Sequence, residues 1–521
     1  MSSPPLMEMR SYPTLVDLLN NAATSWPDQL ALADPRTYLT WRELQQIAAR
    51  VAGALVRCGL KPGDRVGVFA PKTARTMASL HGALRAAGVC VPVDPASPVA
   101  RAAAVFEDCS PAVVIGSAAE LSTLNLSYAH ARISLDDTAV GALSWDEVMS
   151  CQPLPAHAPV QASDLAYLLY TSGSTGQPKG VMLSHQNVSS FACWAAAEFE
   201  LGTSDRIASV APLHFDLSTF DIYSSARAGA TLCIPPVLYL SFPAKLTQWM
   251  HEHHISVMYA VPSLLAMILD RGNLKARSLE TLRLLLFAGE VCPPRLLAGV
   301  LEALPNVDFA NLYGPTETNV CTFERIRRQH WDRISPISIG VPCDGTRIVL
   351  VDENETEISG PGKVGELFVT GPTVALGYWR DPEKSSRRFL EREGARWCRT
   401  GDYAEWDIDG HLVFHGRRDH MVKIRGYRVE LGEIEAVLLS HPSVSEGAVV
   451  VVGESLVGFV HLSPDTVSGE KIREYCATRL PRYMIPAVVN ILEEIPHGST
   501  GKIDRLALER KAKAWTTSSN P

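Results

Sequence analysis

The sequence predicts an α/β protein with a large N-terminal domain and a small α+β C-terminal domain. With 521 residues, the chain is too long for one ordinary hydrophobic core. Short apolar strand patterns alternate with helical patterns through about the first 335 residues. The pattern then changes at about residue 335 and again at about residue 418, where charged residues become dense. These changes predict successive structural parts.

The N-terminal part begins with an alternating helix and strand pattern. Residues 41–60 have apolar positions at helical spacing and end on a glycine. A strand pattern at 64–72, a helical pattern at 75–88 and a strand pattern at 89–95 follow. This order predicts a parallel βαβ unit. Further strands are expected at 111–117, 206–213, 255–261, 281–290 and 307–314.

The second half of the chain predicts two smaller parts. Residues from about 335 to 417 combine short strand patterns with turn residues, as expected of a β-rich subdomain. We therefore expect one large domain over 1–417. A small α+β domain should cover 418–521, with a polar and frayed tail.

Composition and charge exclude several classes of protein. The net charge is -8 and no basic stripe occurs, so a nucleic acid is not the expected partner. The 11 cysteines form no CxxC pair, which argues against a disulfide framework and a zinc site. No apolar run approaches the ~20 residues of a membrane helix, and the N-terminus lacks signal-peptide features. We expect a cytoplasmic protein without a membrane partner.

Residues 170–180 predict a phosphate-binding loop. An apolar strand pattern, LAYLLY, runs directly into TSGSTGQPKG. Glycines let the backbone turn so that amides approach an anion, hydroxyls donate further hydrogen bonds, and Lys179 adds a positive charge. The spacing is not that of the Walker A motif. The alternative is a flexible polar surface turn, but such a turn needs no strand immediately before it.

At this loop the chain resembles a known family. The segment YTSGSTGQPKGV is similar to the phosphate-loop signature of the adenylate-forming superfamily, which includes acyl-CoA synthetases, luciferases and adenylation domains of nonribosomal peptide synthetases. Further motifs follow in the family's order at 311–318, 399–402, 416–419, 423–430 and 501–505. The resemblance covers about residues 10 to 510. It implies two α/β subdomains and a β-rich subdomain, followed by a small mobile domain.

The resemblance implies an ATP- and Mg²⁺-dependent reaction that joins a carboxylate to the α-phosphate and expels pyrophosphate. Such a site must neutralise charge and align the reactants. Glu317 resembles the Mg²⁺ ligand, since a hard cation prefers carboxylate oxygen. The nucleotide-binding residues implied are Thr171, Ser172, Gly173, Ser174, Gly176, Gly289, Glu290, Asn311, Tyr313, Gly314, Thr316, Asp402, Arg417 and Lys502.

Four of these residues have specific implied contacts with the nucleoside. Tyr313 resembles the aromatic face under the adenine, and Asn311 resembles its hydrogen-bonding partner. Asp402 resembles the carboxylate that accepts both ribose hydroxyls. Arg417 resembles a second ribose or phosphate contact.

The implied catalytic residues are Lys502, Thr175 and Lys179. Lys502 would bridge the substrate carboxylate and the α-phosphate, although a lone lysine is ordinarily a solvated surface charge. Around it, Gly498 and Thr500 stand where the family usually has Thr and Asn. That departure concerns only the detail of the loop.

The resemblance also implies a domain rotation after adenylation. Asp419 resembles the hinge; the alternative is an ordinary loop aspartate. One orientation presents Lys502, and the other presents the loop of Lys423, Arg425 and Gly426 to a thiol acceptor. Closure of the domains would also keep water from the labile anhydride.

Asp216 predicts the class of acid that is activated. In the amino-acid-activating branch of the family, an aspartate at this position pairs with the α-ammonium of the substrate. A buried carboxylate without a cation would be costly, so its presence predicts a cationic group in the pocket. The alternative is a helix N-cap, because aspartate before helix formers often caps.

The other pocket positions are nearly all apolar. By motif they are Leu217, Phe220, Tyr259, Leu286, Ala288, Leu312, Val320 and Cys321. An apolar lining disfavours charged or amide substrates. The bulk of Phe220 and Tyr259 predicts a small cavity, which L-proline fits, and the set resembles that of free-standing prolyl-activating enzymes. Because one methylene is worth only ~1–3 kcal/mol, pipecolate, valine and alanine remain open.

The acceptor is expected to be a separate carrier protein. Only 16 residues follow Arg505, which is too few for a phosphopantetheine-bearing domain. The phosphopantetheine thiol is therefore expected in trans. An acyl- or aryl-CoA synthetase is the first alternative, and Asp216 argues against it. A noncatalytic nucleotide-binding regulator is the second alternative. The presence of Lys502, Glu317 and Asp402 argues against it, because the set of residues needed for the chemistry is complete.

Overall fold

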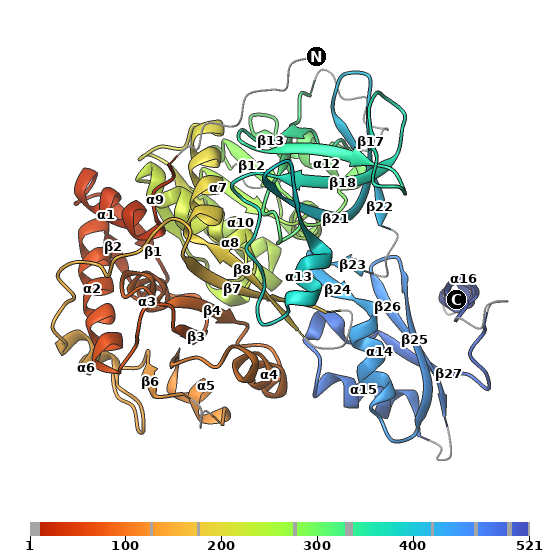
Figure 1. The fold of residues 1–521 in the computed structure, drawn as a ribbon, viewed down its shortest axis with the longest axis horizontal. Helices are drawn as coiled ribbons and strands as arrows, with labels where there is room; N and C mark the ends of the chain where they lie inside the picture. The colour runs from red at the N-terminus through yellow and green to blue at the C-terminus, as the bar shows by residue number, and fades with distance from the viewer. Residues whose placement is uncertain are drawn as a thin grey trace. The chain divides into compact units, whose positions relative to one another are not determined.

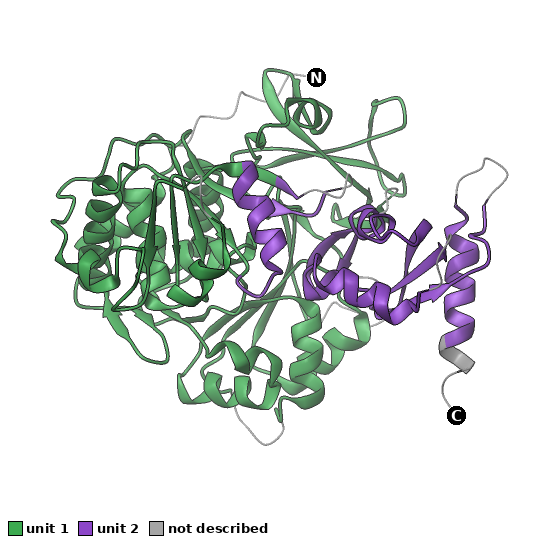
Figure 2. Cartoon of the chain, turned by 90° about the horizontal axis from the view of Figure 1, so that it is seen from below, with its two compact units in different colours: residues 1–94, 109–169, 180–418 green, residues 95–108, 170–179, 419–521 purple. Residues whose placement is uncertain are grey.

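The structure is a computed structural model that describes residues 11–125, 129–173, 178–274, 279–328, 337–417, 421–462, 467–497 and 503–518. The chain forms two compact units (Figure 2). The first consists of residues 1–94, 109–169 and 180–418, and the second of 95–108, 170–179 and 419–521. Two internal segments, 95–108 and 170–179, therefore belong with the C-terminal residues, although the sequence predicts them in the large domain.

The first unit contains a seven-stranded sheet (Figure 1). Its order is β19-β8-β7-β4-β3-β5-β6, and β3 pairs in parallel with both β4 and β5. The expected βαβ unit at 64–95 is present, because α3 joins β3 to β4. The strands are β3 (Arg65–Phe69), β4 (Val89–Val93), β5 (Val113–Gly116), β6 (Ala131–Ser134), β7 (Leu165–Thr171), β8 (Lys179–Ser184) and β19 (Gly377–Tyr378). The first helices are α1 (Leu15–Ser25), α2 (Trp41–Arg57), α3 (Ala74–Arg85), α5 (Ala118–Thr123) and α6 (Trp145–Ser150).

A nine-stranded sheet follows, in the order β15-β14-β13-β12-β11-β9-β10-β1-β2. Strands β9, β11, β12 and β13 are mutually parallel, so their carboxyl ends lie at one edge of the sheet. The strands are β1 (Leu30–Ala33), β2 (Tyr38–Thr40), β9 (Arg206–Ala208), β10 (Thr231–Cys233), β11 (Val257–Ala260), β12 (Leu284–Phe287), β13 (Asp308–Tyr313), β14 (Thr322–Arg325) and β15 (Val341–Pro342). The helices are α7 (His185–Glu198), η2 (Val237–Ser241), α10 (Pro243–Glu252), α11 (Pro262–Arg271) and α12 (Pro294–Ala303).

One helix in this region changes its winding. Helix α8 (Leu217–Thr219) runs into the π-helical turn η1 (Phe220–Ser224) and then into α9 (Ser225–Ala228). Gly229 ends the helix with φ of 69°, a left-handed conformation that favours glycine. Single π turns are rare inside helices and are frequent at functional sites.

The β-rich part is an antiparallel six-stranded sheet, as the strand patterns of 335–417 predict. Its path is β17-β16-β18-β21-β20, and β22 also pairs with β21. The elements are β16 (Arg347–Val351), β17 (Glu357–Ile358), β18 (Gly365–Thr370), α13 (Pro382–Arg388), β20 (Phe389–Arg392), β21 (Ala395–Trp406) and β22 (Leu412–Arg417).

The second unit has the expected α+β character. A hairpin precedes a three-stranded sheet in the order β25-β26-β27. Ile434, Val449, Val460 and Ile472 pack in one core between helices and sheet. The elements are α4 (Val99–Cys109), β23 (Met421–Ile424), β24 (Tyr427–Glu430), α14 (Leu431–Leu439), β25 (Val444–Val452), β26 (Ser455–Leu462), α15 (Gly469–Ala477), η3 (Arg482–Met484), β27 (Val488–Ile491) and α16 (Arg505–Ser518).

The cysteines and the helices bear on disulfide bonds and on membrane spans, respectively. All eleven cysteines are free thiols, and most are buried. Across the described part of the chain, no helix combines the length and the apolar character needed to cross a membrane.

Candidate active site

Asp216 lies between β9 and the helix that contains the π turn. The residue is only 9% exposed, and its side chain makes no capping hydrogen bond to the helix. The capping alternative is therefore wrong. The backbone carbonyl of Asp216 instead accepts hydrogen bonds from the Thr219 amide at 2.9 Å and the Thr219 hydroxyl at 2.6 Å.

Most of the predicted pocket residues pack together. Phe220, Tyr259, Leu286, Ala288, Leu312 and Val320 are buried in one cluster, with Leu217 packed against it. Cys321 is buried in the neighbouring cluster, which also contains Tyr313. The rings of Phe220 and Tyr259 meet edge to face, with centroids 5.3 Å apart. Two large aromatic rings therefore fill much of the space beside Asp216.

The electrostatic surroundings of Tyr259 link it to two carboxylates. Burial raises the pKa of the Tyr259 phenol well above its usual value, and the negative charges of Asp216 and Asp221 raise it further. The phenol therefore stays neutral and can donate a hydrogen bond. Asp216 is therefore close enough to act on Tyr259 of the apolar cluster.

Tyr313, Asp402 and Arg417 form a buried polar group. The Tyr313 hydroxyl donates to Asp402 Oδ2 at 2.5 Å, and Arg417 Nη1 donates to Asp402 Oδ1 at 2.7 Å. Asp402 on β21 is directly opposite Arg417 on β22. Burial, followed by the charge of Asp402, raises the pKa of Tyr313 well above its usual value. The structure thus brings together three of the four nucleoside residues that the sequence indicates.

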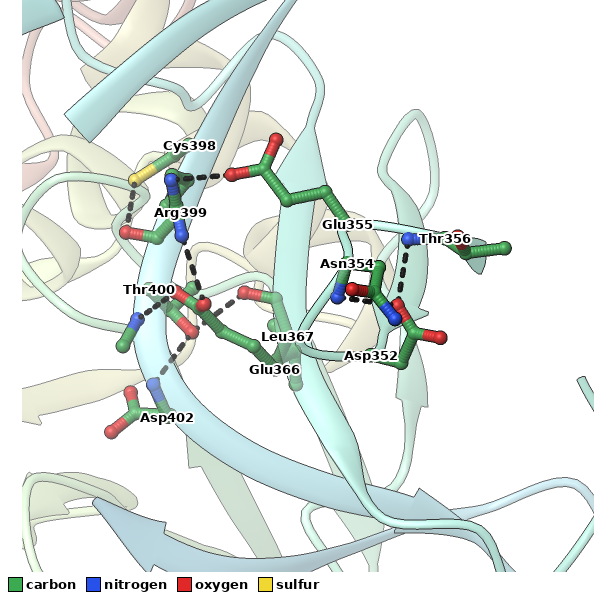
Figure 3. Close-up of polar contacts among 11 residues, drawn as sticks. Asp352, Asn354, Glu355, Thr356, Glu366, Leu367, Cys398, Arg399, Thr400 and Asp402 are labelled. Atoms are coloured by element: carbon green, nitrogen blue, oxygen red, sulfur yellow. Dashed lines mark hydrogen bonds and ion pairs between the residues drawn. The ribbon is translucent and has the colours of Figure 1, made fainter. Parts of the chain in front are cut away.

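The backbone around Asp402 is held by the neighbouring strand β18 (Figure 3). The Thr400 hydroxyl donates to the Leu367 carbonyl at 2.7 Å and accepts from the Asp402 amide at 3.1 Å. Arg399 contacts Glu366 at 3.3 Å, and the Gly401 amide donates to the same carboxylate. These bonds fix the strand from which the Asp402 carboxylate projects.

The fourth nucleoside residue, Asn311, lies two residues before Tyr313 on β13. Its side-chain amide donates to the Ser338 carbonyl at 2.8 Å. After β13 the chain turns sharply at Gly314, where an added Cβ would lie 1.6 Å from the Asn319 carbonyl oxygen. Only glycine fits so close an approach. Thr316 lies inside this turn and its carbonyl accepts from the Asn319 amide at 3.5 Å.

Gly289 and Glu290 follow strand β12 at the same edge of the sheet. Gly289 has φ of 90°, a conformation that favours glycine. The Glu290 carboxylate accepts a hydrogen bond from the Ser263 amide at 2.8 Å, at the start of α11.

The phosphate-loop segment lies in the second unit. Thr171 ends β7 and Lys179 begins β8, so the segment joins two adjacent strands. Ser172 Oγ donates to the Arg428 carbonyl at 2.7 Å. Ser174, Thr175 and Gly176 lie outside the described residues.

The amide of Gly173 already contacts an anion. It donates to Glu433 Oε2 at 3.3 Å, and the other oxygen of Glu433 pairs with Arg101 on α4. Burial raises the pKa of Glu433, while Arg101 acts to lower it. This end of the loop therefore contacts the carboxyl group of Glu433.

The remaining implied positions are the catalytic Lys502, the hinge residue Asp419 and the loop of Lys423, Arg425 and Gly426. Lys502 and Asp419 lie outside the described residues. Lys423 lies on β23, and Arg425 and Gly426 form the turn to β24 with φ of 50° and 80°.

Comparison with known proteins identifies the family. A family model described as AMP-binding enzyme matches residues 19–379, and one described as AMP-binding enzyme C-terminal domain matches residues 433–502. The chain belongs to the AMP-binding enzyme family.

Relatives of this AMP-binding enzyme carry a specific name. The chain is 38% identical over 505 residues to an L-proline--[L-prolyl-carrier protein] ligase of Pseudomonas fluorescens, and the match covers 96% of this chain and 99% of the relative. It is 37% identical over 499 residues to a protein of the same name from Streptomyces coelicolor, covering 90% and 92%.

Solved structures agree on the fold. The amide bond synthetase McbA from Marinactinospora thermotolerans has a TM-score of 0.85 at 22% identity, covering 96% of this chain and 99% of that one. An NRPS protein containing adenylation and PCP domains, bound to a vinylsulfonamide inhibitor, has a TM-score of 0.81 at 25% identity, covering 96% and 84%.

The surroundings of Glu317 in this AMP-binding enzyme fit Mg²⁺. Glu317 is fully buried, and Oε1 accepts from the Tyr378 hydroxyl at 2.6 Å. Among the described residues, no group of three or more His, Cys, Asp or Glu could hold a metal. A single carboxylate suits Mg²⁺, which takes much of its coordination from phosphates and water.

Sequence reasoning missed Arg388, which lies beside Glu317. Burial acts to lower the pKa of its guanidinium, but Glu317 and other nearby groups hold that pKa above its usual value. Its Nε and Nη2 are buried without a hydrogen-bond partner among the described residues. Arg388 lies in no motif, and only its position at the end of α13 brings it to Glu317.

Sequence reasoning also missed Asn319. Its side-chain oxygen accepts from the Val320 amide at 2.7 Å, and its Nδ2 contacts Thr219 Oγ1 at 3.5 Å. It therefore connects the turn after Tyr313 to the helix that follows Asp216. Its place directly after the motif at 311–318 is the signal that could have found it.

Proposed function

We propose that this enzyme activates L-proline with ATP as prolyl-AMP and transfers the prolyl group to the phosphopantetheine thiol of a separate carrier protein. The observation that carries the proposal is the buried, uncapped carboxylate of Asp216 beside a cramped apolar cluster. The names of the two ligase relatives support the same substrate and acceptor. We propose the cytoplasm, where ATP is supplied, as its location.

Asp216 recognises the substrate nitrogen. A buried carboxylate in an apolar site is costly unless a cation compensates its charge, and the secondary ammonium of proline supplies that cation. Phe220 and Tyr259 limit the length of the side chain, so a compact ring is favoured over a long or polar side chain. The substrate carboxylate is thereby oriented towards the nucleotide.

Tyr313, Asn311, Asp402 and Arg417 hold the nucleoside. The Asp402 carboxylate already accepts from Tyr313 and Arg417, which fixes its orientation before the ribose binds. Glu317 would hold Mg²⁺, which when bound neutralises phosphate charge. Buried Arg388 lies beside this carboxylate, and the charge of Glu317 helps to raise the pKa of the Arg388 guanidinium.

Lysine and hydroxyl groups stabilise the negative charge at the reacting centre. We propose that Lys502 stabilises the charge that develops between the substrate carboxylate and the α-phosphate, and that Lys179, Thr175 and the phosphate loop hold the departing pyrophosphate. Rotation about Asp419 then presents Lys423, Arg425 and Gly426 to the incoming thiol.

Loading of a carrier protein tests the proposal. Holo-carrier protein is incubated with the enzyme, ATP, Mg²⁺ and proline, and its intact mass is measured. The expected result is an increase of one prolyl residue that is removed by hydroxylamine. Coenzyme A in place of the carrier is expected to remain unmodified. Efficient formation of a CoA thioester from an aryl or fatty acid, without carrier loading, would contradict the proposal.

A further inference from the structure

Lys72 lies on the loop between β3 and α3, far in sequence from every motif. Its ammonium donates to the Ser209 carbonyl at 3.0 Å, to Ser209 Oγ at 2.8 Å and to the Ala211 carbonyl. Ser209 and Ala211 directly follow β9, in the segment that leads to Asp216. A lysine that follows a strand of the seven-stranded sheet therefore binds a segment that follows a strand of the nine-stranded sheet.

Asp221 lies on the other side of Asp216, inside the π-helical turn. It is fully buried, and its Oδ2 accepts from Ser209 Oγ at 3.1 Å. Oδ1 has no hydrogen-bond partner among the described residues. Ser209 thus accepts from Lys72 and donates to Asp221, so the three groups form one chain.

The two charges compensate each other. Burial lowers the pKa of Lys72 and the charge of Asp221 raises it. Burial likewise raises the pKa of Asp221, and Lys72 lowers it. Breaking such a buried pair by removing one partner leaves an uncompensated charge, which is strongly destabilising.

We propose that Lys72, Ser209 and Asp221 form a clamp that closes the segment 209–221 and orients Asp216 at its centre. The inference rests on the proposed function, because it assigns Asp216 to the substrate ammonium. Lys72 and Asp221 are positioning residues: they act through Asp216 and do not touch the substrate. A shift of about 1 Å in a positioned group can cost on the order of 10²-fold in rate. Loss of the clamp should therefore weaken amino-acid recognition selectively.

The test compares Lys72→Met, Asp221→Asn and the double variant in amino-acid-dependent ATP–pyrophosphate exchange. Each single variant is expected to raise the KM for proline roughly tenfold or more, while the KM for ATP changes less than about threefold. The double variant should be little worse than the worse single variant, because both break one clamp. Lys72→Arg should recover part of the loss. Equal changes in both KM values, or unchanged values, would overturn the clamp.

Arg283→Met is the matched control. Arg283 pairs with Asp205 at 2.8 Å. Asp205 lies immediately before β9, at the opposite end of that strand from Ser209. Its loss should lower the unfolding temperature without raising the KM for proline selectively. Circular dichroism checks that each variant is folded, and the Lys72→Arg variant keeps the test valid if Lys72→Met does not fold.

The outcome for the clamp is separate from that for proline. The ratio of the two KM values is measured with the amino acid that the unmodified enzyme activates best. Activation of another amino acid would refute the assignment of proline, yet a selective rise in its KM would still support the clamp. If the enzyme activates proline but the variants keep the KM values of the unmodified enzyme, only the clamp is refuted.

Discussion

We propose that Asp216 determines which class of acid the enzyme accepts. We expect Asp216→Asn to raise the KM for proline by roughly 10²- to 10³-fold or more, because removing one partner of a buried ion pair costs about 3–5 kcal/mol. The KM for ATP should change less than about threefold, since Asp216 does not hold the nucleotide. Steady-state pyrophosphate exchange, with each substrate varied in turn, measures both constants.

Asp402 should show the opposite selectivity. Asp402→Asn keeps the size of the side chain but weakens the bonds to Tyr313 and Arg417. We expect the KM for ATP to rise roughly tenfold or more, with little change for proline, because charge-assisted bonds contribute about 1.5–3 kcal/mol. The two aspartate variants are thus controls for each other. A matching loss for both substrates in either variant would show that the two sites are not separate.

Motifs predicted some of these residues and could not predict others. Tyr313, Asp402 and Arg417 stand in motifs, and the structure brings them together. Lys72 and Asp221 carry no local signal, because their importance arises from contacts between segments distant in sequence. A buried ion pair of that kind becomes visible only after the chain has folded.

We propose that the interrupted helix after Asp216 sets the size of the substrate pocket. Phe220, the first residue of the π turn, is fully buried between Phe191 and Tyr259. We expect Phe220→Ala to shift activation towards larger apolar amino acids, such as leucine and phenylalanine, because truncation opens a cavity. Stability should fall by about 3–5 kcal/mol, as for other buried Phe→Ala changes. Exchange rates over a panel of amino acids measure the shift.

Phe191→Leu provides the control for this change. Phe191 packs against the other side of Phe220, with centroids 6.3 Å apart, and lies on α7 outside the predicted lining. The Phe191→Leu variant should be less stable, but the ranking of amino acids by exchange rate should not change. An unaltered ranking in Phe220→Ala would contradict the proposed pocket.

The regular elements were more predictable than the irregular ones. The strand, helix, strand order of residues 64–95 follows from hydrophobic spacing, and the structure contains it. The π turn at Phe220–Ser224 has no spacing signal of its own, because all five of its residues are buried, the polar Asp221 and Ser224 included. The grouping of 170–179 with the C-terminal residues depends on contacts such as Ser172 to Arg428, which spacing does not encode.

Stability of the whole protein should depend on two buried histidines. Burial lowers the pKa of His81 and of His185 from 6.5 to about 4 in each case. His185 Nδ1 accepts from the Leu15 amide at 3.2 Å, which requires an unprotonated nitrogen. Between pH 6.5 and 4 the unfolded chain binds more protons than the folded one, so stability falls as pH falls.

We therefore expect the unfolding temperature to drop between pH 7 and pH 5, with His81 contributing up to about 3 kcal/mol by pH 4. His81→Leu removes the titrating group and should make this dependence shallower. Differential scanning fluorimetry at a series of pH values measures it. Met77→Leu, a change at a buried residue of the same helix that does not titrate, should leave the slope as it was. Parallel profiles for His81→Leu and the unmodified protein would contradict the assignment.

ATP–pyrophosphate exchange with a panel of acids tests the central assignment most directly. Proline is compared with pipecolate, valine and alanine, and with fatty and aryl acids, at equal concentrations. The greatest exchange is expected with proline, and none above background with acids that lack an amino group. Exchange driven by a fatty or aryl acid, with no stimulation by any amino acid, would contradict the role given to Asp216.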